Sequence, residues 1–121
     1  MDNFCKTVLE SVLDIKAEKT VVIDISKVSL MADYMIVCTG RSSSHTQGIA
    51  NNILEKAKEN NFKVYSIEGL NDGNWILIDL GNALIHIMTE ETREYYKIEK
   101  LWSNGNTLYS EINEVKELKN V

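Results

Sequence analysis

The chain of 121 residues has no proline, two cysteines and two histidines. Cys5 and Cys38 lie far apart and form no Cys-x-x-Cys pair, and two histidines leave little for a His-rich metal site. We therefore expect no metal and no cofactor, and we expect both cysteines to be reduced core residues. Because proline, repeats and low-complexity stretches are all missing, the sequence offers no boundary between two large domains.

Long apolar runs and positive charge are also scarce. No stretch approaches the roughly 18 apolar residues of a membrane helix, and the first six residues are too polar for an export signal. We expect a cytosolic protein without a membrane partner. The 13 Lys and Arg residues against 18 Asp and Glu give a net charge of −5. This balance argues against broad binding to nucleic-acid phosphates and favours a basic protein partner.

The apolar pattern predicts one α/β domain over residues 1–103, with elements in the order α-β-β-α-β-β-β-α. We expect a mixed sheet of about five strands with helices mainly on one face. Helices are predicted from about residue 4 to residues 16–19, from 44 to 60 and from 89 to 102, and strands at 21–25, 34–39, 62–67 and in a hairpin at 74–88.

Local signals mark the ends of these elements. Ser44 and Gln47 have the spacing of a capping box, Asn60-Asn61 is a natural helix stop, and Thr89 is an expected N-cap. Residues 104–121 are expected to form a tail. Its apolar residues have the spacing of a short helix: Leu108, Ile112, Val115 and Leu118.

Residues 74–88 are the most informative stretch, because Gly81-Asn82 suits a two-residue type II′ hairpin turn. Such a turn fixes the strand pairing and gives the ribbon two different faces. One face is wholly aliphatic and must lie in the core: Ile76, Ile78, Leu80, Ala83, Ile85 and Ile87. The other, here called the mixed face, combines apolar groups with an acid and an imidazole: Trp75, Leu77, Asp79, Leu84, His86 and Met88. This composition is typical of a surface built for a partner.

Structural alternatives remain open for the mixed face. Trp75 suits a small second core as well as an interface, and Leu77 and Met88 become core residues if a helix covers them. Asp79 and His86 lie one diagonal apart, so they are close enough for a hydrogen-bonded pair. Since no nucleophile accompanies that pair, the simpler interpretation is that Asp79 supports the turn and His86 is a neutral side chain.

Six motifs follow one another between residues 2 and 102. They are Ala32-Asp33-Tyr34, Thr39-Gly40-x-Ser42-Ser43-x-His45, Glu68-Gly69-Leu70-x-x-Gly73-x-Trp75, Asp79-x-Gly81, His86-Ile87 and Glu91-x-Arg93-x-Tyr95-Tyr96-x-Ile98-Glu99-x-Leu101-Trp102. In order and spacing they resemble the Iojap family of ribosomal silencing factors, abbreviated RsfS. The resemblance does not cover residues 106–121.

The resemblance implies a cytosolic factor that binds the large ribosomal subunit through its ribosomal protein fourteen. Such a factor blocks joining of the small subunit and silences translation when nutrients run low. The partner contacts expected on this basis are Trp75, Leu77, Asp79, His86, Met88, Glu91, Arg93 and Tyr96. Because the aromatic residues of the last helix cannot all face inward, a homodimer face is a further expectation. A minor contact with ribosomal RNA also stays open.

The turn at residues 39–44 connects a strand to a helix, as in sites that hold a phosphate on backbone N–H groups. The resemblance implies a topology like that of nucleotidyltransferases, which carry two carboxylates on a following strand. Residues 63–68 supply no such pair to hold magnesium. We therefore interpret the turn as a helix cap and expect no catalysis. A nucleotide-binding enzyme that uses the Gly40 turn is the alternative.

Overall fold

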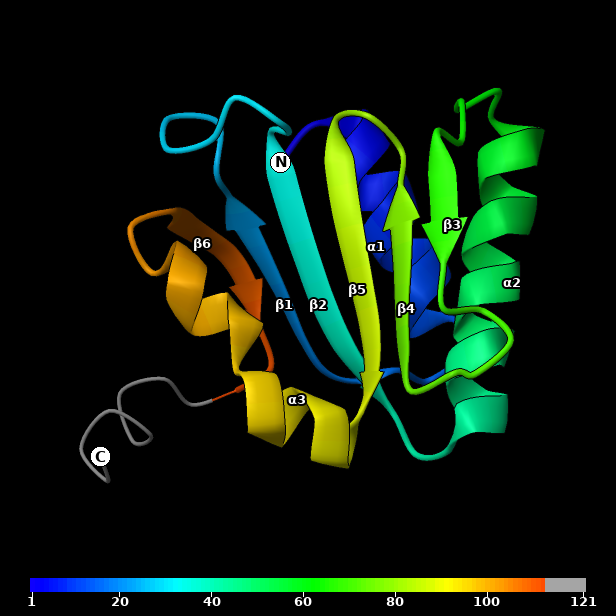
Figure 1. The fold of residues 1–121 in the computed structure, drawn as a ribbon. Helices are drawn as coiled ribbons and strands as arrows, with labels where there is room; N and C mark the ends of the chain where they lie inside the picture. The colour runs from blue at the N-terminus through cyan, green and yellow to red at the C-terminus, as the bar shows by residue number, and fades with distance from the viewer. Residues whose placement is uncertain (113–121) are drawn as a thin grey trace.

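The computed structural model describes residues 1–112, which form one mixed sheet with helices on both faces (Figure 1). The strands are β1 (Glu18–Asp24), β2 (Tyr34–Gly40), β3 (Ser66–Glu68), β4 (Trp75–Asp79), β5 (Ala83–Thr89) and β6 (Asn106–Ser110). Their spatial order is β3-β4-β5-β2-β1-β6. The central pair β2–β5 is parallel and all other neighbours are antiparallel. The predicted α/β class and mixed sheet are confirmed, with six strands instead of about five.

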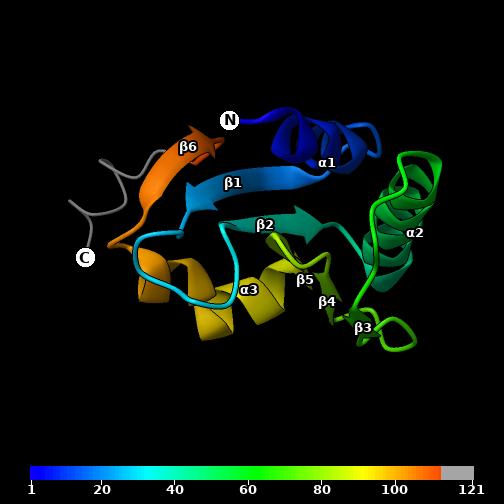
Figure 2. The same cartoon turned by 90° about the horizontal axis from the view of Figure 1, so that it is seen from above.

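The two long helices lie on one face of the sheet, as expected (Figures 1 and 2). They are α1 (Asn3–Leu13) and α2 (Ser43–Glu59). The opposite face is partly covered by α3 (Glu90–Tyr96) and the short 3-10 helix η1 (Ile98–Trp102). The sheet therefore has one face covered by the two long helices and one face that is only partly covered.

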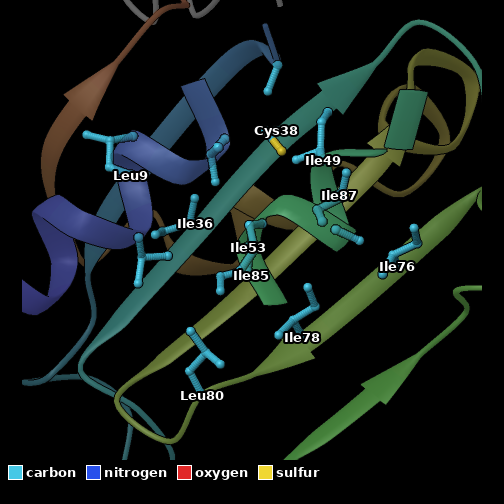
Figure 3. Close-up of a cluster of buried hydrophobic side chains, with 14 of the residues drawn as sticks. Leu9, Ile36, Cys38, Ile49, Ile53, Ile76, Ile78, Leu80, Ile85 and Ile87 are labelled. Atoms are coloured by element: carbon cyan, nitrogen blue, oxygen red, sulfur yellow. The ribbon is translucent and has the colours of Figure 1, made fainter. Parts of the chain in front are cut away.

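Aliphatic packing fills the space between the sheet and the long helices (Figure 3). All six residues of the aliphatic hairpin face are buried, as predicted, and all of them except Ala83 belong to this core. The pairing is also as predicted, from Trp75 opposite Met88 to Asp79 opposite Leu84, and Gly81 has the positive φ, 83°, that the turn requires. Cys5 and Cys38 are free and fully buried, in agreement with the expectation. Burial raises the pKa of the Cys5 thiol to about 11 and that of Cys38 to about 12.

A second, smaller core lies under α3 and η1. Its buried members are Val21, Ile23, Ile25, Ala32, Met35, Val37, Met88 and Ile98. These residues come from β1, the β1–β2 loop, β2, the end of β5 and η1. Part of the mixed face is therefore core, which is one of the alternatives that the sequence left open.

The segment after residue 105 forms a strand where the spacing of Leu108 predicted the start of a helix. β6 pairs with β1, with Val22 opposite Tyr109 and Asp24 opposite Asn106. This pairing satisfies backbone groups along β1 that no other strand reaches. The helix prediction is wrong for residues 106–110 and for Ile112, which lies in a bend, while Val115 and Leu118 lie outside the described residues.

Other boundaries also differ from the predictions, among them the end of α1, which lies at Leu13 instead of at residues 16–19. The last helix is interrupted at Lys97, whose φ is 47°, so residues 89–102 form two short elements. Ser42, not Ser44, caps α2 and accepts a hydrogen bond from the His45 N–H. β3 spans only Ser66–Glu68 instead of residues 62–67. The predicted stop of α2 is confirmed, with Asn60 as C-cap and Asn61 at φ 59°.

Candidate functional site

The part of the mixed face that α3 and η1 leave uncovered is the candidate site. Trp75, Leu77, Asp79 and His86 alternate with buried neighbours along β4 and β5, and each is half-buried. Tyr96 is exposed at the end of α3 and packs on Trp75, with ring centroids 4.8 Å apart. Tyr95 packs in turn on Tyr96 at 4.8 Å. The exposed large side chains thus continue from the sheet onto the helix.

Trp75 and His86 are joined by a hydrogen bond. The indole N–H of Trp75 donates to Nδ1 of His86 over 3.0 Å. Burial lowers the pKa of His86 to about 4, against a smaller opposing effect of Glu99. The imidazole is therefore neutral at pH 7, and its Nδ1 can accept a hydrogen bond from the indole N–H.

Asp79 serves the turn and does not pair with His86. Its Oδ1 accepts a hydrogen bond of 2.8 Å from the Gly81 N–H. This Asx-type contact stabilises the hairpin connection. The simpler of the two interpretations drawn from the sequence is therefore confirmed for both residues, and the dyad is not formed.

Two of the eight expected contact residues are buried, which corrects their placement on the surface. Met88 is 0% exposed because the second core closes over the end of β5. Arg93 is 5% exposed because its guanidinium turns inward from α3. The other six are accessible: Trp75, Leu77, Asp79, His86, Glu91 and Tyr96.

Arg93 ties three elements together under the site. Its Nη1 donates to the Lys19 backbone carbonyl in β1 and to Thr39 Oγ1 in β2, the latter over 3.0 Å. Its Nε donates to Glu99 of η1 over 3.1 Å. This bridge fixes the two short helices across the break at Lys97. The spacing of six between Arg93 and Glu99 gave no sign of it, because helical ion pairs occur three or four residues apart.

Sequence reasoning did not name Tyr95 and Leu101 as site residues. Their exposed fractions are 81% and 76%, the largest among the apolar side chains of α3 and η1. The sequence did indicate that some of these side chains are exposed, because the last predicted helix carries more large side chains than one buried stripe accommodates.

The Gly40 turn is packed against another loop. Gly73 lies so close to the first turn of α2 that a Cβ on it would meet Ser43 Cβ at 2.8 Å. The Thr46 hydroxyl donates to the Gly73 carbonyl, and Gln47 donates to the Leu70 carbonyl over 3.0 Å. Thus the turn acts as a junction between α2 and the loop that leads to Trp75. Within residues 1–112, no group of three or more His, Cys, Asp or Glu side chains is arranged to hold a metal ion.

Similarity to known proteins agrees with this architecture. The model of a family described as "Ribosomal silencing factor during starvation" matches residues 2–121. The chain belongs to the ribosomal silencing factor family. The match also includes the segment from residue 106 onward, which the sequence motifs did not cover.

Individual relatives of this family match most of the chain. The ribosomal silencing factor RsfS of Bacillus subtilis is 38% identical over 92 residues, which cover 76% of this chain and 78% of the relative. That of Haemophilus influenzae is 38% identical over 95 residues, covering 78% and 93%. A crystal structure of a Chromobacterium violaceum protein superposes with a TM-score of 0.82 at 32% identity, covering 93% and 95%.

Membership in the ribosomal silencing factor family implies association with the ribosome and a role in regulating translation. The family is described by silencing and not by a chemical reaction. None of the helices in residues 1–112 has the length and hydropathy to cross a membrane.

Proposed function

We propose that this protein binds the large ribosomal subunit through its ribosomal protein fourteen and sterically prevents the small subunit from joining. Translation would thereby be repressed when nutrients are limited. The observation that carries the proposal is the partly uncovered mixed face, where half-buried Trp75 and exposed Tyr96 pack on each other. Aromatic side chains of this kind dominate the binding energy of many protein interfaces.

The proposed contact surface consists of the accessible expected residues, Trp75, Leu77, Asp79, His86, Glu91 and Tyr96, together with Tyr95. A standard interface buries about 800 Å² on each partner. α3 lies beside β5 (Figure 2), and Tyr96 of α3 packs on Trp75 of β4, which joins the two parts of the proposed surface. Met88 and Arg93 contribute from beneath by holding the surface in place.

Charge supports a basic partner. The net charge is −5, and acidic side chains flank the aromatic residues. Glu68 pairs opposite Leu77 and is therefore on the same face of the sheet, and Glu91 is exposed in the first turn of α3. Such an arrangement attracts a basic protein and repels phosphate backbones, so contact with ribosomal RNA is at most a minor part of the proposal.

The proposed mechanism is binding without catalysis. Exclusion of one subunit by a bound protein needs no chemical step, and the loop at Gly73 packs against Ser43 at the end of the Gly40 turn. The proposed location is the cytosol, where ribosomal subunits join. As an alternative, the exposed residues Tyr95 and Leu101 contact a second copy of the chain in a homodimer.

The test is co-sedimentation of the purified protein with separated large and small subunits, followed by an assay of subunit joining on the fraction that binds. We expect binding to the large subunit only, with loss of joining. Trp75→Ala should weaken binding by about 1 to 2 kcal/mol, because it removes a central aromatic side chain. Unchanged affinity of a folded Trp75→Ala protein would remove Trp75 from the contact surface.

Leu30→Ala is the matched control. Leu30 is a fully exposed apolar residue of the β1–β2 loop, at the opposite end of the strands from Trp75 (Figure 1). The Leu30→Ala protein should bind the large subunit as tightly as the wild type does. Binding to neither subunit would contradict the proposal as a whole.

A further inference from the structure

The indole of Trp75 is held on two sides before any partner arrives. On one side its N–H donates to Nδ1 of His86 over 3.0 Å. On the other side its ring packs on Tyr96, with centroids 4.8 Å apart and planes inclined by 50°. Trp75 is nevertheless only half-buried, so part of the ring faces solvent.

The hydrogen bond changes what Trp75 offers to a partner. An indole N–H that loses water on binding must find an acceptor, or binding is weakened. Here the acceptor is supplied by the protein itself, on the neighbouring strand β5. A partner therefore needs only an apolar surface opposite Trp75, and no carbonyl or carboxylate aimed at the indole nitrogen.

The surroundings of His86 keep Nδ1 available as an acceptor. Burial lowers the pKa of the imidazole to about 4, and Glu99 is the charged group that opposes this shift. Asp79 on the adjacent strand is directed to the turn, where its Oδ1 accepts a hydrogen bond from the Gly81 N–H. At neutral pH the imidazole is uncharged and its proton lies on Nε2.

We infer that His86 is a positioning residue: it fixes the indole of Trp75 in the orientation that the large ribosomal subunit binds, and it makes Trp75 an apolar anchor. This inference rests on the proposed function. Restricting a side chain to its bound orientation reduces the entropy lost on binding. We therefore expect the hydrogen bond to strengthen binding in addition to any contact that His86 itself makes.

The hydrogen bond can be measured without the ribosome. In protein labelled with nitrogen-15, a coupling across the hydrogen bond should connect Nε1 of Trp75 with Nδ1 of His86. Of the two tryptophans, the signal that disappears in Trp75→Phe identifies the relevant indole. Absence of the coupling at pH 7 would overturn the inference.

A pair of variants then separates hydrogen bonding from space filling. Asn and Leu have the same branched shape, but only Asn places an oxygen where Nδ1 of His86 lies. We expect His86→Leu to bind large subunits about three- to tenfold more weakly than the wild type. His86→Asn should recover most of this loss. Equal affinities of the two variants would show that only the volume of His86 matters.

A double substitution sharpens the test. In a Trp75→Phe background no indole N–H remains, so His86→Leu and His86→Asn should bind equally well. A persistent difference between them would contradict an action through Trp75. The thermal unfolding of each variant is measured first, so that binding is compared at a temperature at which all variants are folded.

The inference and the proposed function fail in different ways. If wild-type protein binds no large subunits, the proposed function is wrong, and the binding role of His86 falls with it while the coupling remains. If the wild type binds and Trp75→Ala weakens it, but His86→Leu does not, only the inference about His86 is wrong.

Discussion

The two faces of the sheet carry side chains from the same strands but meet different neighbours. On one face α1 and α2 cover the aliphatic side chains of the central strands, and Ile76, Ile78 and Ile85 are 0% exposed. On the other face the short helices α3 and η1 cover one end and leave Trp75, Leu77 and His86 half-buried. The difference separates a face that stabilises the fold from a face that is available to a partner.

The two faces also differ in the buried polar contacts that they contain. In the described residues, the covered face is filled by aliphatic packing, whereas the partly covered face contains the Arg93–Glu99 ion pair and the Trp75–His86 hydrogen bond. A buried pair of this kind adds little stability compared with apolar packing, but removing one partner is costly because the other is left buried and unpaired. The predictions below test this division, from the largest expected effect to the smallest.

Arg93→Ala should have the largest effect. It removes the bridge between β1, β2 and η1 and leaves Glu99 without its ion-pair partner, so the free energy of unfolding should fall by about 3 to 5 kcal/mol. Chemical denaturation measures this loss. Lys56→Ala, which breaks an exposed ion pair with Glu59, is the control and should change stability by less than about 1 kcal/mol. Similar losses for both variants would mean that Arg93 is not a structural bridge.

Ile76→Ala and Leu77→Ala compare adjacent residues on opposite faces. Ile76→Ala leaves a cavity under α2 and should lower the free energy of unfolding by about 2 to 5 kcal/mol, with affinity for large subunits retained below the melting temperature. Leu77→Ala should destabilise less, because Leu77 is only half-buried, but it should weaken binding. Denaturation and co-sedimentation measure the two effects. If Leu77→Ala were the more destabilising variant and Ile76→Ala the one that weakens binding, the assignment of the two faces would be wrong.

Acid should weaken the partly covered face. The pKa of His86 is about 4 in the folded protein and 6.5 ordinarily, so between these values the unfolded chain binds a proton that the folded protein does not. Stability from this group is therefore complete above pH 6.5 and falls as the pH drops toward 4. The loss is on the order of 2 to 3 kcal/mol. The free energy of unfolding, measured by denaturation at each pH, should fall more between pH 6.5 and 4 for the wild type than for His86→Asn, which has no titrating group at this position. The same pH dependence for both proteins would contradict this prediction.

Asp79→Asn should have the smallest effect. Its Oδ1 still accepts the Gly81 N–H, so stability should stay within about 0.5 kcal/mol. The lost charge should slow association with large subunits about two- to threefold at low salt, because attraction to a basic partner is reduced. The difference should vanish at high salt, where the charge is screened. Kinetics that are equal at low salt would exclude Asp79 from electrostatic recognition.

The hairpin was predictable from sequence because its signals are local. A glycine at the turn and an alternation with period two fix both the register and the inward face. The stop at Asn60-Asn61 is local in the same way. For the mixed face, the sequence could indicate exposure in general, but it could not tell that Met88 lies at the end where η1 closes over the sheet.

The errors involve contacts between distant residues. The pairing of Asn106–Ser110 with β1 spans more than 80 residues, and the propensities of five residues are too weak to decide between a strand and a helix. Three consecutive serines offer equivalent caps, and the choice of Ser42 goes together with contacts of His45 to Ile15 and of Gln47 to Leu70. The burial of Arg93 likewise depends on Lys19 and Thr39, far away in the chain.

The pairing of β6 with β1 also bears on how the protein matures during its own synthesis. β1 is made early, whereas its outer partner is not available until residue 110 has been translated. During that interval the outer edge of Val21, Val22 and Ile23 has no strand to pair with, and exposed edges of this composition promote aggregation. A nascent chain that stalls before β6 is therefore at greater risk of aggregating than the finished protein.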